Sequence, residues 1–589
     1  MGELPKVGIR PTIDGRLQGI RESLEEKTMR MARQVKSLIE KNLRHPSGEI
    51  VACVIAKSTI GGVAESAACE QYFEDEHVKV SLTVTPAWCY GTETIDMHVH
   101  RPKAIWGFNG TKRPGAVYLA AALAAHAQFG LPAFGIYGEH IQSLEDDTIP
   151  EDVAEKILRF VRAGIALSTM RGKSYLSIGS VSMGIAGSII DPKMFKDYFD
   201  MRTEFVDMIE VKRRMDQNIY DADEHVYALN WVKNNLKMGP DYNNTPLKFS
   251  KDKMDSDLSD GVKMTMIIRD LMIGNPKLKA LGFGEESMGH NALISGFQGQ
   301  RAWTDFLPNG DFPETLLNSS FDWNGIRQPY VVATENDALN AISMLLGHLL
   351  TGTAQLFADV RSFWSAESVE KATGYRLQDH SSSGIIHLKN SGSAAMDFVG
   401  GLQKNSKEDP IKPFWKLENS DVHEYITNTQ FCPANLEYFR GGGLSTKFCS
   451  KGNMPLTIFR INDTKGIGLT LQIAEGYSVE LPLAVHETLD NRTDPAWPTT
   501  WFVPKLTDHH PFKSVYDVMN EWGSNHCAAS YGHIGADLIT LASMLRIPVS
   551  MHNIGQDRMM RPKSFGMFGT DSMESSDFRA CGFYGPLYK

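Results

Sequence analysis

The sequence predicts an α/β protein with two Rossmann-like parallel-sheet domains followed by a C-terminal mixed, β-rich (barrel-like) domain. Over the first 170 residues, short apolar runs alternate with segments of helical period, as in a parallel sheet covered by helices on both faces. The alternation restarts near Lys173, and after about residue 360 Gly, Ser, Thr and Pro become frequent between strand-like runs. A chain of 589 residues is long enough for about three domains. We therefore expect domains at residues 1–171, 172–352 and 353–589.

Periodicity predicts the elements of the first domain. A helix is expected to begin at Ser23, because Glu26 three residues later completes a capping box ahead of apolar positions with helical spacing. Further helices are expected over residues 63–73, 118–128 and 153–162. The apolar runs that we expect to form strands lie at residues 7–9, 51–56, 78–85, 104–107 and 133–137.

The later elements follow in the same way. In the second domain, strands are expected at residues 175–178 and 205–210, and helices at 223–237 and 254–273. A buried strand, an apolar helix and another strand then follow, over residues 330–334, 339–350 and 355–360. In the third domain we expect strands at 456–462 and 469–474 and a helix at 536–545.

Charge and composition exclude several classes of partner. The chain has 60 Lys and Arg against 70 Asp and Glu, a net charge of −10, which argues against a nucleic-acid partner. Its seven cysteines form no Cys-x-x-Cys spacing, and we expect free thiols in a reducing compartment. The N-terminus lacks the apolar core of a signal peptide, and the most apolar stretch, residues 117–129, is too short to span a bilayer. We expect a cytoplasmic protein with no membrane partner.

Motifs for nucleotide and serine-hydrolase chemistry are missing. The sequence contains no Walker A motif, no Gly-x-Ser-x-Gly elbow and no His-Glu-x-x-His. The glycines between Gly282 and Gly289 resemble a dinucleotide-binding loop, but the third glycine is one residue late and no clear strand precedes them. We therefore expect no nucleotide cofactor.

Two acids stand where apolar strands are expected to end. Glu335 follows residues 330–334, and Asp359 follows the apolar part of the strand over 355–360. If the intervening helix is the crossover of a parallel βαβ unit, both carboxylates face the crevice at the carboxyl ends of the strands, where ligands bind in open α/β sheets. The alternative is that each acid caps the following helix or begins a loop.

Two carboxylates need a further group to hold a divalent ion. His526 lies in a polar, glycine-containing stretch suited to a loop, and His533 competes with it for the same role. A set of Glu, Asp and His suits manganese or magnesium better than structural zinc, because hard oxygen ligands dominate. Aromatic residues near polar ones are of the kind that stacks on a sugar, namely Trp88, Tyr438, Trp497 and Trp501.

Long sequence strings across the whole chain resemble bacterial L-fucose isomerases. They occur in order and cover both predicted α/β domains and the β-rich domain. The strings are GIRP (8–11), DGR (14–16), TPAWCYGTET (85–94), RPKAIWGFNG (101–110), GFQGQR (296–301), ATEND (333–337), EYFRGGG (437–443), WPTTWF (497–502) and YGPLY (584–588).

The resemblance implies a manganese-dependent aldose–ketose isomerase that converts L-fucose to L-fuculose and also D-arabinose to D-ribulose. It implies that Glu335 and Asp359 are the catalytic acids and that they hold Mn²⁺ together with His526, with Mg²⁺ or Co²⁺ as substitutes. It further implies a homo-hexamer. The positions matching the family's sugar contacts are Arg16, Trp88, Gln298, Gln300, Ser391, Tyr438, Trp497 and Asn525.

The implied reaction proceeds through a metal-stabilised cis-enediol, with one carboxylate moving a proton between C2 and C1 of the open-chain sugar. Two alternatives remain open at this point: a D-arabinose-preferring isomerase, and a non-catalytic sugar-binding protein on the same scaffold. We also expect Trp88 to be supplied to the site of a neighbouring subunit.

Overall fold

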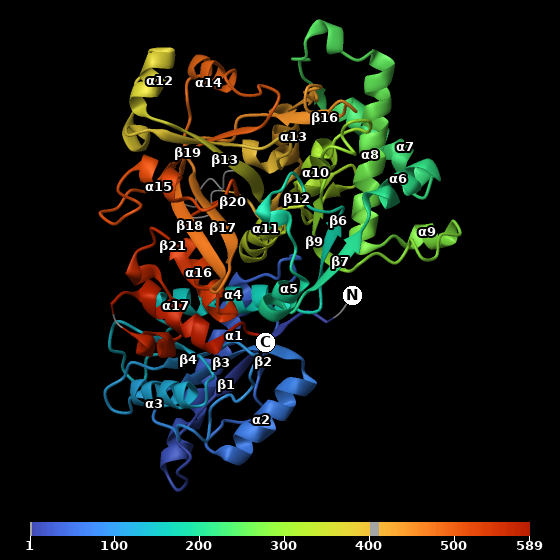
Figure 1. Cartoon of the computed structure of the whole chain (residues 1–589). Helices are drawn as coiled ribbons and strands as arrows, with labels where there is room; N and C mark the ends of the chain where they lie inside the picture. The colour runs from blue at the N-terminus through green and yellow to red at the C-terminus, as the bar shows by residue number, and fades with distance from the viewer. Residues whose placement is uncertain (1–2, 401–410, 570) are drawn as a thin grey trace.

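The computed structural model describes residues 3–400, 411–569 and 571–589 and contains three main sheets that follow one another along the chain (Figure 1). The first sheet is parallel, with strand order β2-β1-β3-β4-β5. Its elements are β1 (Lys6–Pro11), α1 (Ile20–Asn42), β2 (Cys53–Ile55), α2 (Val63–Asp75), β3 (Val78–Thr85), β4 (Lys103–Gly107), α3 (Gly115–Gln128), β5 (Phe134–Tyr137) and α4 (Glu151–Met170).

The first helix begins earlier than the sequence predicts, at Ile20 rather than at Ser23. The backbone N–H of Gly19 donates to Glu22 Oε2 at 2.6 Å, so Glu22 closes the first turn instead of Glu26. The Ser23 hydroxyl donates to the Ile20 carbonyl within that turn. The expected capping box was therefore wrong by about one turn, because a second acid with the same chemistry stands four residues earlier.

The second sheet is also parallel, with order β12-β9-β6-β7. The strand predicted over residues 205–210 ends at Val206, because Asp207 accepts from the Ile209 N–H and caps a helix. The elements of this region are β6 (Ser174–Ile178), α5 (Pro192–Phe199), β7 (Arg202–Val206), α6 (Met208–Asp216), α7 (Ala222–Asn235), α8 (Lys251–Ile273), α9 (Pro276–Ala280), β9 (Ala292–Phe297), α10 (Asp311–Asn318), β12 (Val331–Thr334) and α11 (Ala338–Thr351).

The third sheet closes into a barrel. Six strands pair antiparallel in the cyclic order β17-β20-β13-β14-β19-β18, and β18 pairs with β17 again. This confirms the predicted β-rich, barrel-like domain, in which closure leaves these strands without an open edge. The elements are β13 (Leu356–Trp364), β14 (Ile385–Lys389), β17 (Pro455–Thr464), β18 (Gly468–Ser478), β19 (Thr499–Pro504), β20 (His526–Tyr531) and β21 (Val549–Met551), the last parallel to β18.

The remaining helices and strands lie outside the three main sheets. Three of them, β8, β15 and β16, form a small sheet of their own. These elements are β8 (Lys237–Met238), β10 (Phe321–Asp322), β11 (Gly325–Ile326), α12 (Ala366–Thr373), α13 (Asn419–Thr427), β15 (Gln430–Pro433), β16 (Leu444–Lys447), α14 (Leu483–Asp490), α15 (Val515–Glu521), α16 (Gly535–Leu545) and α17 (Met573–Tyr584).

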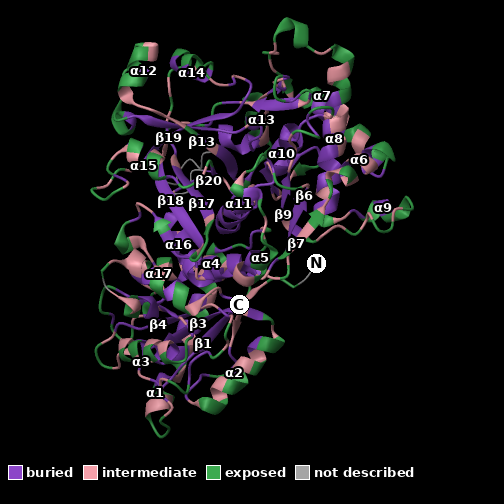
Figure 2. Cartoon of the chain, in the orientation of Figure 1, coloured by how far each residue is buried: buried purple, intermediate pink, exposed green. Residues whose placement is uncertain are grey.

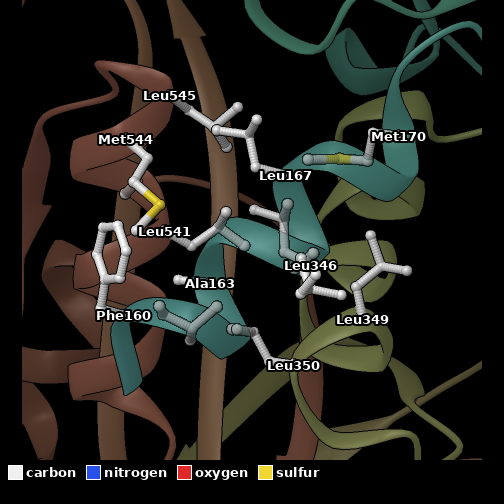
Figure 3. Packing of buried hydrophobic residues seen from close by; sticks show 14 of the residues in the cluster. Phe160, Ala163, Leu167, Met170, Leu346, Leu349, Leu350, Leu541, Met544 and Leu545 are labelled. Carbon is white, nitrogen blue, oxygen red and sulfur yellow. The ribbon is translucent and has the colours of Figure 1, made fainter. Parts of the chain in front are cut away.

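Helix α4 joins the first sheet to the barrel. Figure 3 shows its side chains between α16 on one side and α11 on the other, with Phe160 and Leu167 facing Leu541 and Leu545 of α16. These residues are buried, and each large apolar side chain contributes about 1.5–3 kcal/mol by leaving water. Figure 2 shows the barrel strands β17 and β18 coloured mainly as buried. The three sheets are therefore held together by one continuous apolar cluster. None of the helices within the described residues combines the length and the apolar character needed to cross a bilayer.

Candidate active site

Glu335 lies on a strained turn between β12 and α11. Glu335 and Asn336 both have left-handed backbones, with φ of 58° and 54°, and such residues persist only where their surroundings hold them. Asn336 supplies this support from a buried position. Its Oδ1 accepts from the Tyr175 hydroxyl at 2.6 Å, and its Nδ2 donates to the Ser177 hydroxyl at 3.0 Å. The turn thus presents the Glu335 carboxylate beyond the end of the second sheet.

Asp359 and His526 lie side by side in the barrel. They are directly opposite each other in the antiparallel pair β13–β20, which brings Asp359 Oδ1 within 3.2 Å of His526 Nε2. The same nitrogen lies 3.5 Å from Glu335 Oε2. Both acids selected from the sequence therefore lie next to Nε2 of the selected histidine.

The route that brings the acids together differs from the predicted one. The sequence pattern suggested that β12, α11 and β13 form a parallel βαβ unit. Instead β12 pairs with β9 of the second sheet, whereas β13 pairs antiparallel with β14 and β20 of the barrel. Asp359 also lies within its strand, and His526 is the first residue of β20 rather than part of a loop. The local apolar pattern could not reveal that the chain changes sheets after α11.

The site combines two carboxylates with a protonatable ring. Burial raises the pKa of Glu335 to about 7, against the lowering effect of the nearby His526. Burial alone would lower the pKa of His526, but hydrogen bonds to Asp337 and Asp359 raise it to about 9. Burial likewise opposes the ionised form of Asp337, yet the Arg460 charge and the His526 hydrogen bond hold its pKa well below the ordinary value.

The donor atoms suit a hard divalent cation. Within the described ranges, no three His, Cys, Asp or Glu side chains surround a common point in the way that ligands surround an ion. Instead His526 Nε2 contacts each of the two acids directly. Their chemistry nevertheless fits: Glu335 and Asp359 offer carboxylate oxygens, and His526 offers Nε2 while its Nδ1 contacts a carboxylate. Metal-ligating histidines are commonly oriented by such a carboxylate.

Two predicted sugar-contacting residues touch these groups directly. Gln300 Nε2 donates to Glu335 Oε1 at 3.2 Å, and Asn525 Nδ2 lies 2.9 Å from His526 Nε2. Both amides therefore border the carboxylates and retain further hydrogen-bonding capacity for a polyhydroxy ligand.

An aromatic wall leads away from Asp359. The guanidinium of Arg361 donates to Asp359 Oδ2 at 3.3 Å and lies over the Trp497 ring, 5.2 Å from its centre. The Tyr438 ring follows, 6.1 Å from Trp497 and 61% exposed. Flat rings beside acids and amides are typical of carbohydrate sites, because the apolar face of a sugar packs on them.

Ser391 and Gln298 lie on segments next to the turn. The Ser391 hydroxyl is buried and has no hydrogen-bond partner within the described residues, and the side chain of neighbouring Asn390 donates to Thr334 at the end of β12. Gln298 instead contacts backbone, since its Oε1 accepts from the Ser180 N–H at 2.7 Å. The structure therefore places Ser391 near the end of β12. The Gln298 side chain is instead hydrogen-bonded to the backbone of Ser180.

Arg16 and Trp88 belong to a different part of the molecule. Arg16 lies between β1 and α1 and pairs with Asp14, and Trp88 follows β3 and packs against a buried cluster that includes Tyr118. Figure 1 shows the first sheet on the opposite side of α4 from β13 and β20. Within one subunit, the structure therefore does not bring these two residues to Glu335.

Sequence reasoning missed Asp337 and Arg460. Asp337 contacts His526 Nδ1 at 2.6 Å and Arg460 Nη1 at 2.7 Å. Asp337 stands inside the ATEND string, and Arg460 interrupts the apolar run between Ile458 and Ile461. A charged residue on a buried strand needs a partner, so Arg460 was a usable signal for a polar site. His533, the competing ligand, lies elsewhere, with its Nε2 2.9 Å from the Gly476 carbonyl.

Glu314 is a buried acid next to Thr334, and its pKa predicts how the stability of the fold changes with pH. Thr334 donates to Glu314 Oε2 at 2.6 Å, and burial raises the pKa of Glu314 to about 8. The folded chain therefore keeps a proton that the unfolded chain releases near pH 4.5, the ordinary Glu pKa. Relative to Glu314→Gln, the wild type should lose unfolding free energy as pH rises from about 4.5 to about 8, at up to ~1.4 kcal/mol per pH unit.

Denaturant unfolding of both proteins across this pH range measures the effect. The gap in unfolding free energy should be constant below pH 4.5, where the wild-type group is protonated in both states. Glu314→Gln leaves the other ionisable side chains in place, so a gap that does not change with pH would show that Glu314 is not held protonated.

Known proteins resemble the whole chain. Family models described as the first N-terminal, second N-terminal and C-terminal domains of L-fucose isomerase match residues 4–172, 173–352 and 388–552. The L-fucose isomerase of Vibrio vulnificus (strain YJ016) is 60% identical over 589 residues, covering all of both chains. Those of Streptococcus pneumoniae strains D39 and TIGR4 are 59% identical over 585 and 586 residues, 99% of each chain. The chain therefore belongs to the L-fucose isomerase family.

Proposed function

We propose that this protein is an aldose–ketose isomerase that converts L-fucose to L-fuculose and uses Mn²⁺. The observation that carries the proposal is the meeting of Glu335, Asp359 and His526 from two different sheets. It is supported by the similarity to proteins named L-fucose isomerase over the full chain. Glu335, Asp359 and His526 would hold the cation, with Mg²⁺ or Co²⁺ as possible substitutes.

The chain's own groups suffice for the proton transfers. One of the two carboxylates removes the proton from C2 of the open-chain aldose and returns it to C1, while the other handles the proton exchanged between O1 and O2. Gln300 and Asn525 border these acids and fix the orientation of the sugar hydroxyls. A bound divalent cation supplies Lewis acidity at the carbonyl. The reaction moves hydrogen within one molecule, so it needs neither nucleotide nor external oxidant.

A ketose assay with Mn²⁺ tests this function. L-fucose and D-arabinose are supplied in parallel, and formation of L-fuculose and D-ribulose is followed. We expect turnover of both sugars with the higher kcat/KM for L-fucose. A higher value for D-arabinose would favour the D-arabinose-preferring alternative, and binding without turnover of any aldose would indicate a non-catalytic sugar-binding protein.

The position of Trp88 motivates a proposal about assembly. Trp88 matches a sugar-contacting position, yet it lies in the first domain, away from Glu335. We infer that the protein assembles as a homo-hexamer in which Trp88 of one subunit completes the sugar site of a neighbour. Each site then takes its acids and its indole from different chains.

Subunit mixing checks this expectation. Trp88→Ala and His526→Ala homo-oligomers should each have low activity. After mixing and reassembly, sites that combine the intact indole of one variant with the intact histidine of the other should regain activity. Equal mixing therefore restores up to about a quarter of wild-type sites, if exchange is random and each site uses two chains. Mixed oligomers with no gain over either parent would reject the shared site.

A further inference from the structure

We propose that Asp337, held in place by Arg460, is a positioning residue that fixes the tautomer of His526. In this arrangement the proton of the neutral ring resides on Nδ1, and the Nε2 lone pair faces Glu335 and Asp359, where a divalent cation would bind. The inference rests on the proposed function, because it assigns a role toward the cation of that site.

The hydrogen bonds of Asp337 fix the proton on His526 Nδ1 in both the charged and the neutral ring, so the Nε2 proton is the one that leaves when a cation binds. Its side chain is fully buried, and its Oδ1 accepts from the Asn340 N–H at 3.0 Å as the cap of α11. Its Oδ2 lies 2.6 Å from His526 Nδ1 and accepts from Arg460 Nη1 at 2.7 Å. An ionised carboxylate only accepts hydrogen bonds, so the His526 nitrogen that faces it must carry the proton.

Arg460 keeps Asp337 charged and oriented. Its side chain is 2% exposed on β17 of the barrel and reaches across to the turn after β12. Burying an unpaired carboxylate would lower the stability of the fold, but the Arg460 charge neutralises Asp337. Asp337 Oδ2 can still accept a second hydrogen bond, from His526 Nδ1. The chain also leaves room for the pair at Gly187, where a Cβ atom would come within 2.1 Å of Asp337 Oδ1 and 2.6 Å of Arg460 Nη2.

The opposite edge of the ring faces the catalytic acids. Nε2 lies 3.2 Å from Asp359 Oδ1, and the ring packs against Phe357, with 4.7 Å between ring centres. Asn525 Nδ2, at 2.9 Å, makes a favourable hydrogen bond to Nε2 when that atom bears a lone pair. One edge of the ring is therefore anchored by Asp337 and the other is directed at the site.

Asp337 is therefore a different kind of residue from Glu335 and Asp359. Both of its oxygens are already engaged by donors of the chain, and the imidazole ring stands between it and the acids. It is one residue removed from Asn336 and two from Glu335, so the same strained turn supplies a catalytic acid and the support for a ligand.

The test is the Mn²⁺ affinity of chelator-treated full-length protein, measured without sugar from the electron paramagnetic resonance signal of free Mn²⁺. Asp337→Asn is the main variant, because Asn caps helices as well as Asp does. Its amide group cannot satisfy the Asn340, Arg460 and His526 donors together, so His526 is no longer held in one tautomer. We expect the affinity to fall by about 10–100-fold, as for other residues that orient metal ligands.

A matched control separates this role from capping. Asp221→Asn makes the same change at the cap of α7, where Asp221 accepts from the Asp223 and Glu224 N–H groups and pairs with Lys277. It should leave the Mn²⁺ affinity unchanged. The thermal unfolding of metal-free Asp337→Asn is measured beside it. We expect Asp337→Asn to lose affinity while its metal-free unfolding temperature stays within a few degrees of the wild type.

Arg460→Lys gives a second reading if Asp337→Asn does not fold. It keeps the charge but replaces the planar guanidinium by a single ammonium group, and we expect an affinity several-fold below wild type. Affinity within twofold of wild type in a folded Asp337→Asn, or in Arg460→Lys where the first variant does not fold, would overturn the positioning role alone. Failure of the wild type itself to bind Mn²⁺ would instead overturn the proposed metal centre, and the inference with it.

Discussion

Glu335→Gln is expected to lower kcat/KM for L-fucose by about 10²–10⁴-fold, the range that a general base or acid contributes. Gln keeps the shape of Glu and the contact with Gln300, but its amide cannot take up either of the protons that the two acids transfer. Because Glu335 already lies on a strained turn held by Asn336, the change should leave the fold intact. Steady-state rates with Mn²⁺ supplied, together with thermal unfolding, measure both effects. Asp359→Asn should act in the same direction.

Glu367→Gln is the matched control for this change. It makes the same substitution on the exposed face of α12 in the barrel domain, and its activity should equal that of the wild type. Near-wild-type turnover by a folded Glu335→Gln protein would refute the assignment of Glu335 to the reaction.

His526→Ala is expected to abolish tight Mn²⁺ binding, with a loss at least as large as the ~10–100-fold that follows removal of a residue orienting a ligand. The substitution removes Nε2, the atom that lies next to both Glu335 and Asp359. The site then keeps the two carboxylates but loses its nitrogen ligand. Titration of metal-free protein with Mn²⁺ measures the affinity. Activity should recover only in part at high Mn²⁺, because the remaining oxygens still attract the cation weakly.

His533→Ala serves as the comparison, since His533 bonds to the Gly476 carbonyl and lies beside Lys505 rather than beside the acids. It should retain wild-type affinity. If His533→Ala lost affinity and His526→Ala kept it, the ligand assignment would have to be exchanged.

Much of the fold was predictable because local patterns and tertiary structure agree. The apolar run over residues 78–85 matches β3 in full, and alternating strands and helices correctly predict the two parallel sheets. The central strand β9 escaped prediction because Gly296 interrupts the apolar part of its ALISGF sequence, and the missing side chain leaves room for Asn336 and Tyr175. Such a requirement comes from residues distant in sequence, which a local pattern does not contain.

The sequence predicted which residues form the site better than it predicted how the strands bring them together. The sequence selected Glu335, Asp359 and His526, and the structure brings them together, yet it does so by cross-strand pairing within a barrel and not through a parallel βαβ unit. Asp337 and Arg460 were not selected because their function depends on each other's position. Only the closure of the barrel next to the second sheet places a strand arginine against a helix-capping aspartate.

The divided origin of the site has a thermodynamic consequence. Glu335 follows β12, whereas Asp359 and His526 belong to the barrel, so a cation held by all three would bind only while the two sheets remain docked. Binding of this kind adds RT ln(1 + [Mn²⁺]/Kd) to the free energy of separating them, about 2.7 kcal/mol at one hundred times Kd. Metal supply would then govern how often this boundary opens, and with it the protein's resistance to proteolysis at the junction.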